Sequence, residues 1–188
     1  MKSEPASTFR GNRHQRWVVF DPIGVLAGPS WRDIVDTPDS EAWRRFRVGA
    51  IGESEFWGPA DASRYREVLA FRPEPLQLLA RLRSAGYQIC LATNFYRGWL
   101  EVLASDREAP PFDAVLVSSD IGAAKPEPGF WERLLDHVPS GTLFVDDQQA
   151  DCEGAAAAGL RALWAQPRID LSAALSDMLL EGRSCIRS

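Results

Sequence analysis

Six polar residues that could hold a ligand stand at the ends of apolar runs or beside a predicted helix start. They are Asp21, Thr93, Asn94, Lys125, Asp146 and Asp147. Asp21 closes a run of four apolar residues and is followed by Pro22, which cannot donate to a β-ladder, so it is predicted to end a buried strand. Carboxylates and a lysine in one place are compatible with a small anionic ligand that is held by a local cation or a metal.

The elements around these residues predict an α/β fold with a doubly wound, Rossmann-like parallel sheet of about five strands. Apolar strand-like runs alternate with amphipathic helical segments, which is typical of a parallel sheet with helices on both faces. The expected strands are 17–20, 87–92, 112–117, 142–145 and 160–164, and the expected helices are 75–83, 97–104, 130–138, 149–158 and 171–179. The carboxyl ends of such strands meet at one edge of the sheet, so we expect the polar groups to share one cleft.

Residues 27–72 differ from the rest of the chain in composition and pattern. They are rich in Trp, Arg, Pro and Asp, and their apolar residues recur at helical spacing in short pieces broken by Gly and Pro. This predicts a small α-helical cap without strands, inserted into a core domain of residues 17–26 and 73–188. Arg44, Arg45 and Arg47 are expected to form a solvated face of it. Residues 1–16 are polar and predict a disordered leader.

Composition excludes several classes of protein. The 188 residues carry a net charge of −5, which argues against nucleic acid as a partner. No apolar run approaches the length that spans a bilayer, and three scattered cysteines fit a reducing compartment, so we expect a cytoplasmic protein that does not bind membranes. The sequence does not indicate an oligomeric state.

Four motifs, taken in order, resemble those of the haloacid dehalogenase superfamily, in particular its members with a small helical cap after the first strand. The motifs are Phe20-Asp21-Pro22-Ile23-Gly24-Val25-Leu26, Leu91-Ala92-Thr93-Asn94, Lys125-Pro126-Glu127-Pro128 and the stretch from Val145-Asp146-Asp147 to Ala155. Each motif is weak by itself, but their order and their places at predicted strand ends make the resemblance specific. It covers the chain from Trp17 to about Trp164.

The resemblance implies a Mg²⁺-dependent, phosphatase-like hydrolase of a small phosphorylated metabolite. Asp21 would be the nucleophile that forms an aspartyl-phosphate. Mg²⁺ would be held by the carboxylates of Asp21 and Asp146 or Asp147 and by the backbone carbonyl of Ile23. The resemblance further implies that Thr93 and Asn94 bind the transferring group, that Lys125 pairs with Asp21 and with the phosphoryl charge, and that Asp151 supports the site from behind.

One position departs from the family pattern. Phosphatases of this superfamily carry a second aspartate two residues after the nucleophile, which acts as general acid and base, and here that residue is Ile23. The loss of such a group is worth about 10²- to 10⁴-fold in rate, so we expect slow turnover of alkyl phosphates. Three interpretations remain open. The first is a Mg²⁺-dependent phosphatase in which water or a cap residue replaces the missing acid, or whose substrate has a leaving group that needs no proton, such as an acyl or aryl phosphate. The others are a haloacid dehalogenase and a catalytically impaired member that binds a ligand or partner.

Overall fold

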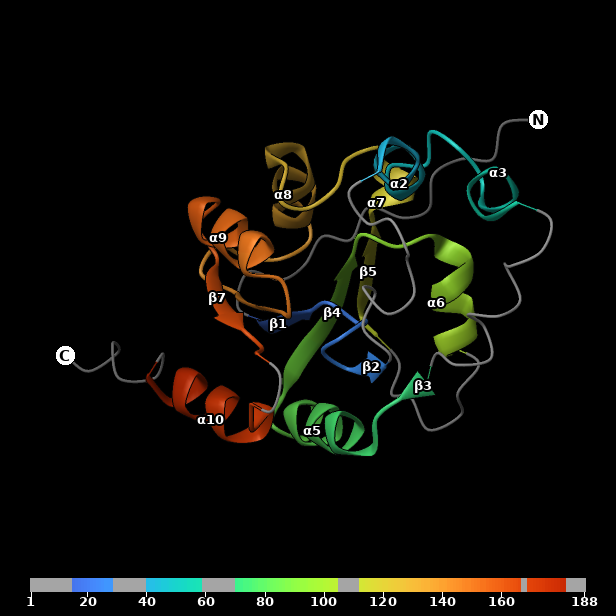
Figure 1. Ribbon diagram of the computed structural model, residues 1–188. Helices are drawn as coiled ribbons and strands as arrows, with labels where there is room; N and C mark the ends of the chain where they lie inside the picture. Colours follow the sequence, from blue (N-terminus) through green and yellow to red (C-terminus); the bar gives the residue numbers. More distant parts are fainter. Residues whose placement is uncertain (1–14, 29–39, 59–69, 105–111, 167–168, 182–188) are drawn as a thin grey trace.

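The computed structural model describes residues 15–28, 40–58, 70–104, 112–166 and 169–181 (Figure 1). The elements are β1 (Arg16–Phe20), β2 (Ala27–Gly28), α2 (Glu41–Arg47), α3 (Glu53–Trp57), β3 (Ala70–Phe71), α5 (Pro73–Ser84), β4 (Tyr87–Thr93), α6 (Arg97–Ala104), β5 (Ala114–Val117), α7 (Ser118–Ile121), α8 (Pro128–Leu135), β6 (Leu143–Asp146), α9 (Gln149–Ala157), β7 (Arg161–Trp164) and α10 (Leu171–Glu181).

A five-stranded parallel sheet organises the molecule, in the order β5-β4-β1-β6-β7. The expected doubly wound α/β fold is therefore confirmed. From the central β1, the chain adds β4 and β5 on one side of the sheet and then β6 and β7 on the other. The place where the order switches sides is where open parallel sheets bind ligands. The residue after β1 is Asp21, and the last residues of β4 and β6 are Thr93 and Asp146.

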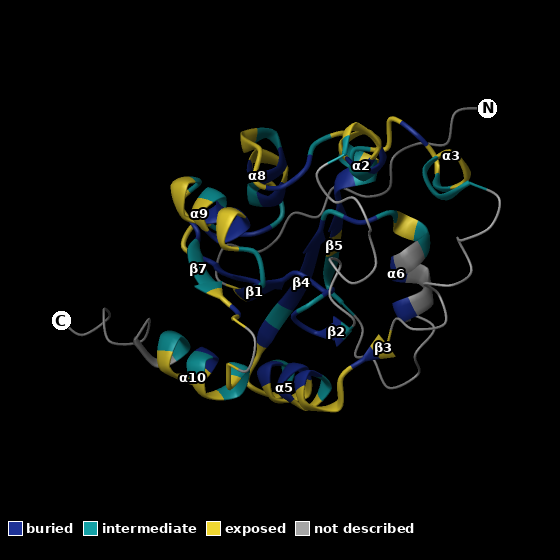
Figure 2. Ribbon diagram, in the orientation of Figure 1, coloured by how far each residue is buried: buried dark blue, intermediate teal, exposed yellow. Residues whose placement is uncertain are grey.

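Side chains of the central strands alternate between two apolar clusters, one on each face of the sheet. Val18 and Phe20 of β1 belong to the cluster that also contains residues of α5 and α10, whereas Val19 belongs to the cluster with residues of α8 and α9. Figure 1 shows these helix pairs on opposite sides of the sheet, and Figure 2 shows β1 and β4 between them mostly buried, whereas β7 at the edge is partly exposed. Both faces are covered, so the strands read as continuous apolar runs.

The segment between β1 and α5 contains helices, as expected, and also two strands that were not expected. β2 and β3 pair antiparallel at its two ends, and with two residues each they are too short to show a periodic pattern. Of the part between them, the structure describes α2 and α3, which contact each other, while α2 also contacts α7. The predictions for residues 29–39 and 59–69 lie outside the described residues, and a cap formed by residues 27–72 stays a prediction.

Several element boundaries differ from the expected ones. β1 begins at Arg16, which pairs with Tyr87, one residue before the expected core boundary; residues 1–14 of the expected leader lie outside the described part. β5 begins at Ala114 rather than Phe112, and just before it the side chain of Asp113 accepts from the backbone N–H of Ile89. The four-residue helix α7 follows β5 directly and is too short to be seen as a helical pattern.

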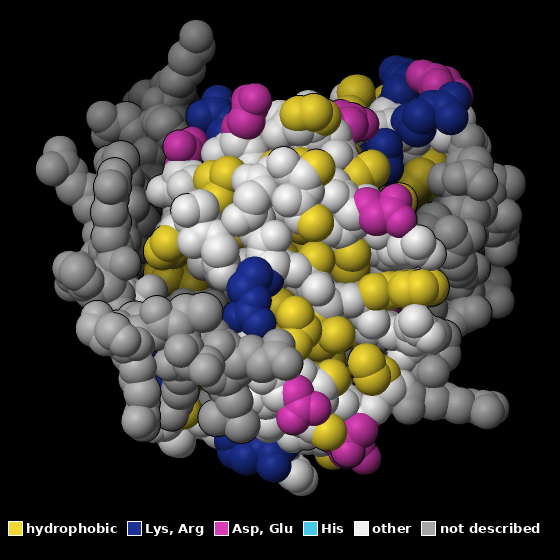
Figure 3. Space-filling view, turned by 90° about the vertical axis from the view of Figure 1, so that its left-hand side faces the viewer, with side chains coloured by type: hydrophobic (Ala, Val, Ile, Leu, Met, Phe, Trp, Pro, Cys, Tyr) yellow, Lys and Arg dark blue, Asp and Glu magenta, His cyan; other side chains and the backbone are white. Residues whose placement is uncertain are grey.

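The face that carries β7 and α10 shows apolar side chains at its centre among polar and basic ones (Figure 3). Large hydrophobic residues that are exposed among the described ones include Trp164, at the end of β7, and Ile169, before α10. No helix in the described ranges is long and apolar enough to cross a membrane.

Candidate active site

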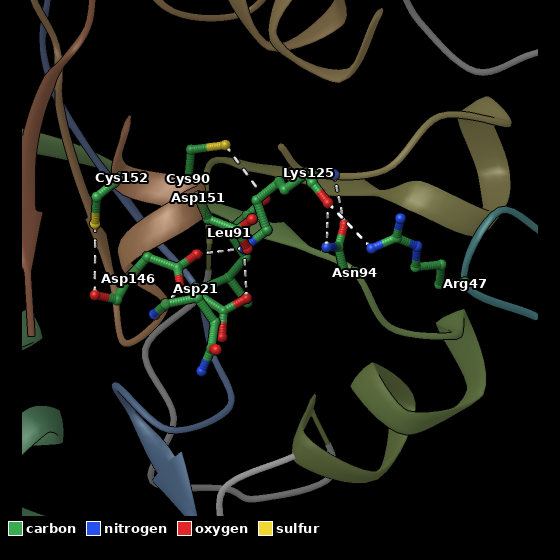
Figure 4. A network of polar contacts seen from close by, with 10 residues as sticks. Asp21, Arg47, Cys90, Leu91, Asn94, Lys125, Asp146, Asp151 and Cys152 are labelled. Atoms are coloured by element: carbon green, nitrogen blue, oxygen red, sulfur yellow. Dashed lines mark hydrogen bonds and ion pairs between the residues drawn. The ribbon is translucent and has the colours of Figure 1, made fainter. Parts of the chain in front are cut away.

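A buried lysine joins two carboxylates that are more than a hundred residues apart in the sequence. Lys125 Nζ donates to Asp21 Oδ1 at 2.8 Å and to Asp146 Oδ2 at 2.6 Å (Figure 4). Lys125 is 1% exposed and Asp146 is fully buried. The ends of β1 and β6 lie side by side in the sheet, and the loop before α8 brings the lysine to them, as expected from the strand order.

The ammonium group is stable at this depth only because anionic partners surround it. Burial by itself would lower the pKa of Lys125, but the carboxylates of Asp146, Asp21 and Asp151 raise it above its ordinary value. The Phe144 ring lies on another side of the ammonium, with its centroid 5.2 Å from Nζ. Lys125 therefore stays charged and offers a fixed positive charge next to Asp21.

Asp21 is also buried, and its surroundings oppose its charge in part. Burial raises the pKa of its carboxyl group, Lys125 lowers it, and the neighbouring Asp146 and Asp147 raise it again. The net result is a pKa well above the ordinary value of an aspartate. A cation beside Asp21 would relieve this repulsion and favour the ionised, nucleophilic form.

The two adjacent aspartates after β6 have different surroundings. Both oxygens of Asp146 are engaged, Oδ2 by Lys125 and Oδ1 by the backbone N–H of Gln148 at 2.8 Å. Asp147 Oδ1, in contrast, is buried and has no hydrogen-bond partner among the described residues. Burial raises the pKa of Asp147. Of the pair, Asp147 has the oxygen that is free to bind a further ligand.

The carboxylates of Asp21, Asp146 and Asp147 could hold a divalent cation. One oxygen from each lies within 4.8 Å of the others, and hard oxygen ligands of this kind suit Mg²⁺. Gly24 packs against Asp147 so closely that a Cβ at that position would stand 2.3 Å from Asp147 Oδ2, and Gly24 has a φ of +91°. Glycine is thus required both by the backbone and by the position of the carboxylate. The indole N–H of Trp164 donates to the backbone carbonyl of Asp147 at 3.0 Å and so helps to fix the main chain at this residue.

Thr93 and Asn94 both lie in this region, but their side chains differ in their partners. Thr93 is fully buried, and its hydroxyl has no hydrogen-bond partner within the described part of the chain. A buried hydroxyl without a partner is costly unless a ligand or water satisfies it. The amide of Asn94 already has two partners, the backbone N–H and carbonyl of Lys125, at 2.7 and 2.9 Å.

Asp151 lies next to the lysine, where the family resemblance implied a supporting residue. Its Oδ2 is 3.8 Å from Lys125 Nζ. Burial raises the pKa of Asp151 to about 6, and the nearby Lys125 opposes this rise. Its carboxylate contacts the lysine rather than the cluster of possible metal ligands, which agrees with a supporting position.

Arg47 was expected on a solvated face, and for this residue the expectation is wrong. Its guanidinium donates to the carbonyl of Lys125 at 3.3 Å and to Glu127 at 3.2 Å, and its side chain is 19% exposed. Arg44 and Arg45 are exposed, as expected. The last turn of α2 carries all three arginines, and of these it is Arg47 that faces the loop of Lys125.

Two residues that the sequence analysis did not single out support the loop of Lys125. The indole N–H of Trp131 donates to the carbonyl of Pro126 at 2.9 Å. Gly154 allows α9 to approach this contact, because a Cβ there would lie 2.8 Å from Trp131 Nε1 and 2.9 Å from Pro126 Cβ. The only sequence signal for this approach is a glycine in the middle of an alanine-rich helix.

Ile23, at the position where the family pattern has an acid, is 1% exposed. It belongs to the same buried apolar cluster as Trp43, Phe46 and Phe95, which come from α2 and from the residue pair after β4. Phe46 stacks on Phe56 with ring centroids 4.5 Å apart, so aromatic side chains dominate this side of the cluster. The environment two residues after Asp21 is therefore apolar.

Comparisons with known proteins agree with this fold. A family model described as haloacid dehalogenase-like hydrolase matches residues 14–159. The phosphoserine phosphatase of Thermus thermophilus is 34% identical over 97 residues, which are 49% of this chain and 39% of that relative, so the chain spans less than half of its length.

Two solved structures show the same fold. A HAD family enzyme from Bacteroides thetaiotaomicron, in complex with magnesium and inorganic phosphate, has a TM-score of 0.68 and 20% identity and covers 85% of this chain and 98% of its own. The L-2-haloacid dehalogenase from Xanthobacter autotrophicus, with chloropropionic acid covalently bound, has a TM-score of 0.58 and 20% identity, with 93% and 85% covered. Because the family model covers most of the sequence and the polar residues meet at the switch point of the sheet, the chain belongs to the haloacid dehalogenase-like hydrolases.

Proposed function

We propose that this protein is a Mg²⁺-dependent phosphatase-like hydrolase that forms an aspartyl-phosphate on Asp21. The observation that carries the proposal is the position of Lys125 Nζ between Asp21 and Asp146, next to three carboxylates that can share one cation. The likeness to a phosphoserine phosphatase and to a structure that holds magnesium and phosphate supports it. The substrate would be a small phosphorylated compound.

In the proposed reaction, a carboxylate oxygen of Asp21 attacks the phosphorus atom and the ester bond to the leaving oxygen breaks. Lys125 compensates negative charge on Asp21 and on the phosphoryl oxygens, and the buried hydroxyl of Thr93 donates to one of these oxygens. Water then attacks the phosphorus of the aspartyl-phosphate, releases phosphate and restores Asp21.

Mg²⁺ would be held by Asp21, by Asp147 and by the backbone carbonyl of Ile23, with Asp146 beside them. The unpartnered Oδ1 of Asp147 is the feature that fits a cation best, since it is buried without another donor. A bound cation would neutralise charge on the attacking carboxylate and the phosphoryl oxygens. Asp146 would hold Lys125 in place, because its two oxygens already have partners.

The apolar surroundings of Ile23 set the expected choice of substrate. An alkoxide leaving group needs a proton, and Ile23 cannot supply one. Aryl and acyl phosphates have leaving groups that depart without protonation, so they should react fastest in this site. Ile23 is buried and belongs to an apolar cluster, which is compatible with an apolar leaving group.

We expect Mg²⁺-dependent release of phosphate from aryl and acyl phosphates, and release from alkyl phosphates that is slower by about 10²-fold or more. The test is a panel of all three classes, with free phosphate measured in Mg²⁺ and after chelation. Equal rates for alkyl and aryl esters would contradict the role given to Ile23. Retained binding of Mg²⁺ and of a phosphate analogue, without turnover of any substrate, would instead select a binding member of the family.

A haloacid dehalogenase is the second candidate, because halide leaves without a proton and the apolar environment of Ile23 would then be harmless. The three neighbouring carboxylates oppose it, since without a cation they would repel a carboxylate substrate. Release of halide from 2-haloalkanoates without added metal would favour the dehalogenase over the phosphatase.

Mg²⁺ should stabilise the protein, and more strongly as the pH rises above the ordinary aspartate value of 3.8. In the metal-free protein, burial raises the pKa of Asp21 and Asp147, two of the proposed ligands. The native state thus holds protons that the unfolded state has lost, so stability is lost as the pH rises from 3.8 through these raised pKa values. A cation takes over the role of these protons. Thermal melting with and without Mg²⁺ across this range measures the effect.

The matched control is the pair Asp147→Asn and Asp113→Asn. The first removes the proposed ligand charge and should abolish most of the Mg²⁺-induced shift in Tm. The second makes the same change where Asp113 accepts from Ile89 N at the amino end of the sheet, and it should leave the shift intact. A Mg²⁺ effect that survives Asp147→Asn would contradict the proposed ligand set.

A further inference from the structure

The side chain of Asn94 forms two hydrogen bonds to a single residue of a distant loop. Its Oδ1 accepts from the backbone N–H of Lys125 at 2.7 Å, and its Nδ2 donates to the backbone carbonyl of Lys125 at 2.9 Å (Figure 4). The two residues are 31 positions apart, one directly after β4 and the other before α8. An amide is the neutral side-chain group that can donate and accept at this spacing, so the side chain matches both backbone groups of residue 125.

These bonds fix the backbone from which the ammonium group extends. Lys125 has a long side chain with four rotatable carbons, and its Nζ must reach Asp21 and Asp146 together. A side chain of this length is positioned only when its Cα is held, and a shift of about 1 Å in a catalytic group can cost about 10²-fold in rate. Arg47 and Trp131 add contacts to the carbonyls of Lys125 and Pro126, but only Asn94, among the described residues, binds both backbone groups of Lys125.

We propose that Asn94 is a positioning residue for Lys125: its amide holds the backbone of residue 125 so that the ammonium bridges Asp21 and Asp146. It would not serve primarily as a contact to the phosphoryl group, which is the role that family resemblance implied for it. The catalytic consequence rests on the proposed function, whereas the effect on Lys125 itself does not. One N–H of the Asn94 amide remains beyond these two bonds, so the experiment must separate positioning from direct contact.

The sequence offers an unusually clean readout, because Lys2 and Lys125 are its only lysines. The rate of acylation of Lys125 can be followed by mass spectrometry of its peptide, with the Lys2 peptide as internal reference. In the native protein, burial and the ion pairs with Asp21 and Asp146 protect Lys125. We expect Asn94→Ala to raise its acylation rate at least about tenfold under conditions where the protein remains folded.

Two further variants calibrate this measurement. Asn94→Asp retains an acceptor for the N–H of Lys125 but loses the donor to its carbonyl, so its effect should be intermediate. Asp113→Ala removes a side-chain acceptor at the opposite end of β4, which binds Ile89 N at 2.8 Å and pairs with Arg83 at 2.9 Å. It should lower Tm without exposing Lys125. Unchanged protection of Lys125 in Asn94→Ala would overturn the proposal, whether or not the protein hydrolyses phosphate esters.

Kinetics then tests the catalytic consequence with a double-mutant cycle. Asn94→Ala should lower kcat about 10- to 100-fold and change KM less than about twofold, because it disturbs a group that acts in the transition state. In a protein that already carries Lys125→Met, adding Asn94→Ala should lower kcat by less than a further factor of about two. Should Lys125→Met not fold, Asp146→Asn takes its place in the cycle. Independent losses that multiply would show that Asn94 contacts the phosphoryl group, and would overturn the positioning role.

The wild-type protein could protect Lys125 from acylation, lose this protection in Asn94→Ala, and yet neither bind Mg²⁺ nor release phosphate. This result would contradict the proposed function and support the positioning of Lys125 by Asn94. An active wild-type protein, with an Asn94→Ala variant that is equally active and equally protected from acylation, would contradict the positioning role and leave the proposed function standing.

Discussion

Replacing Asp21 with asparagine should abolish phosphate release, with a loss on the order of 10⁴-fold or more, because the amide cannot act as the nucleophile. The variant should fold. Asparagine has the same shape, the backbone N–H of Asp21 still reaches the carbonyl of Val145 at 2.9 Å, and Lys125 keeps its contact of 2.6 Å to Asp146. The substitution also removes a buried carboxylate, whose burial and whose repulsion by Asp146 and Asp147 raise the pKa of Asp21 in the wild-type protein. The measurement is the single-turnover rate with an aryl phosphate in Mg²⁺.

Asp113→Asn provides the matched control, since it makes the same chemical change outside the site and should retain full activity. Trapping gives independent evidence: an acid quench during turnover should leave a phosphoryl group on the peptide that contains Asp21, and no label in Asp21→Asn. If Asp21→Asn still released phosphate at a substantial rate, water would have to attack the substrate directly, and the aspartyl-phosphate mechanism would be wrong.

The parts of the site that could be predicted from the sequence are those that depend on strand ends. Asp21, Thr93 and Asp146 each follow or close an apolar run, and the topology of a parallel sheet brings such ends together whatever the loops do. The approach of Lys125 to Asp21 follows less directly, because it depends on the path of the loop before α8. The pairing of Lys125 with Asp21 was predicted from the resemblance of its motif to the family pattern, and the distance of 2.8 Å between Lys125 Nζ and Asp21 Oδ1 agrees with it.

The parts that could not be predicted depend on contacts between side chains and the backbone of distant residues. No periodicity indicates that the amide of Asn94 binds Lys125, or that Arg47, rather than Arg44, turns toward the loop. Adjacent residues Asp146 and Asp147 look equivalent in the sequence, yet the end of β6 directs one to the lysine and leaves an oxygen of the other without a partner. The two-residue strands β2 and β3 are likewise set by their pairing and not by a pattern.

Ile23 shows how one substitution could change the chemistry of a site without changing its fold. Its backbone lies in the turn after Asp21, where the N–H of Gly24 donates to the carbonyl of Ala27, and its side chain belongs to the core cluster that also contains Trp43 and Phe46 of the insertion. The hydrogen bond of this turn does not involve the side chain of Ile23, so the main chain can keep its path when residue 23 changes. This separates the proposed metal site, which needs the backbone, from the acid and base function, which needs the side chain.

Ile23→Asp should therefore raise the rate of phosphoryl transfer from alkyl phosphates to Asp21 by about 10²- to 10⁴-fold, while transfer from aryl and acyl phosphates, whose leaving groups need no proton, changes little. A carboxyl group in this apolar place would have a raised pKa, which suits an acid that protonates a leaving alkoxide. The change also destabilises the protein, because an apolar side chain that is 1% exposed is replaced by a polar one. With a cost of about 3 kcal/mol, Tm should fall by roughly 6 to 12 °C. The measurement is the single-turnover rate of leaving-group release from matched alkyl and aryl esters, made well below the new Tm.

Ile23→Asn separates the proton from the packing. It has the same size as the aspartate variant and should lose as much stability, but it carries no transferable proton and should gain nothing on alkyl esters. A gain in both variants would mean that loosening the apolar cluster, and not acid catalysis, limits turnover. No gain in either, with aryl phosphates still hydrolysed, would show that the side chain at position 23 does not reach the leaving oxygen, and that the preference for good leaving groups arises elsewhere in the site.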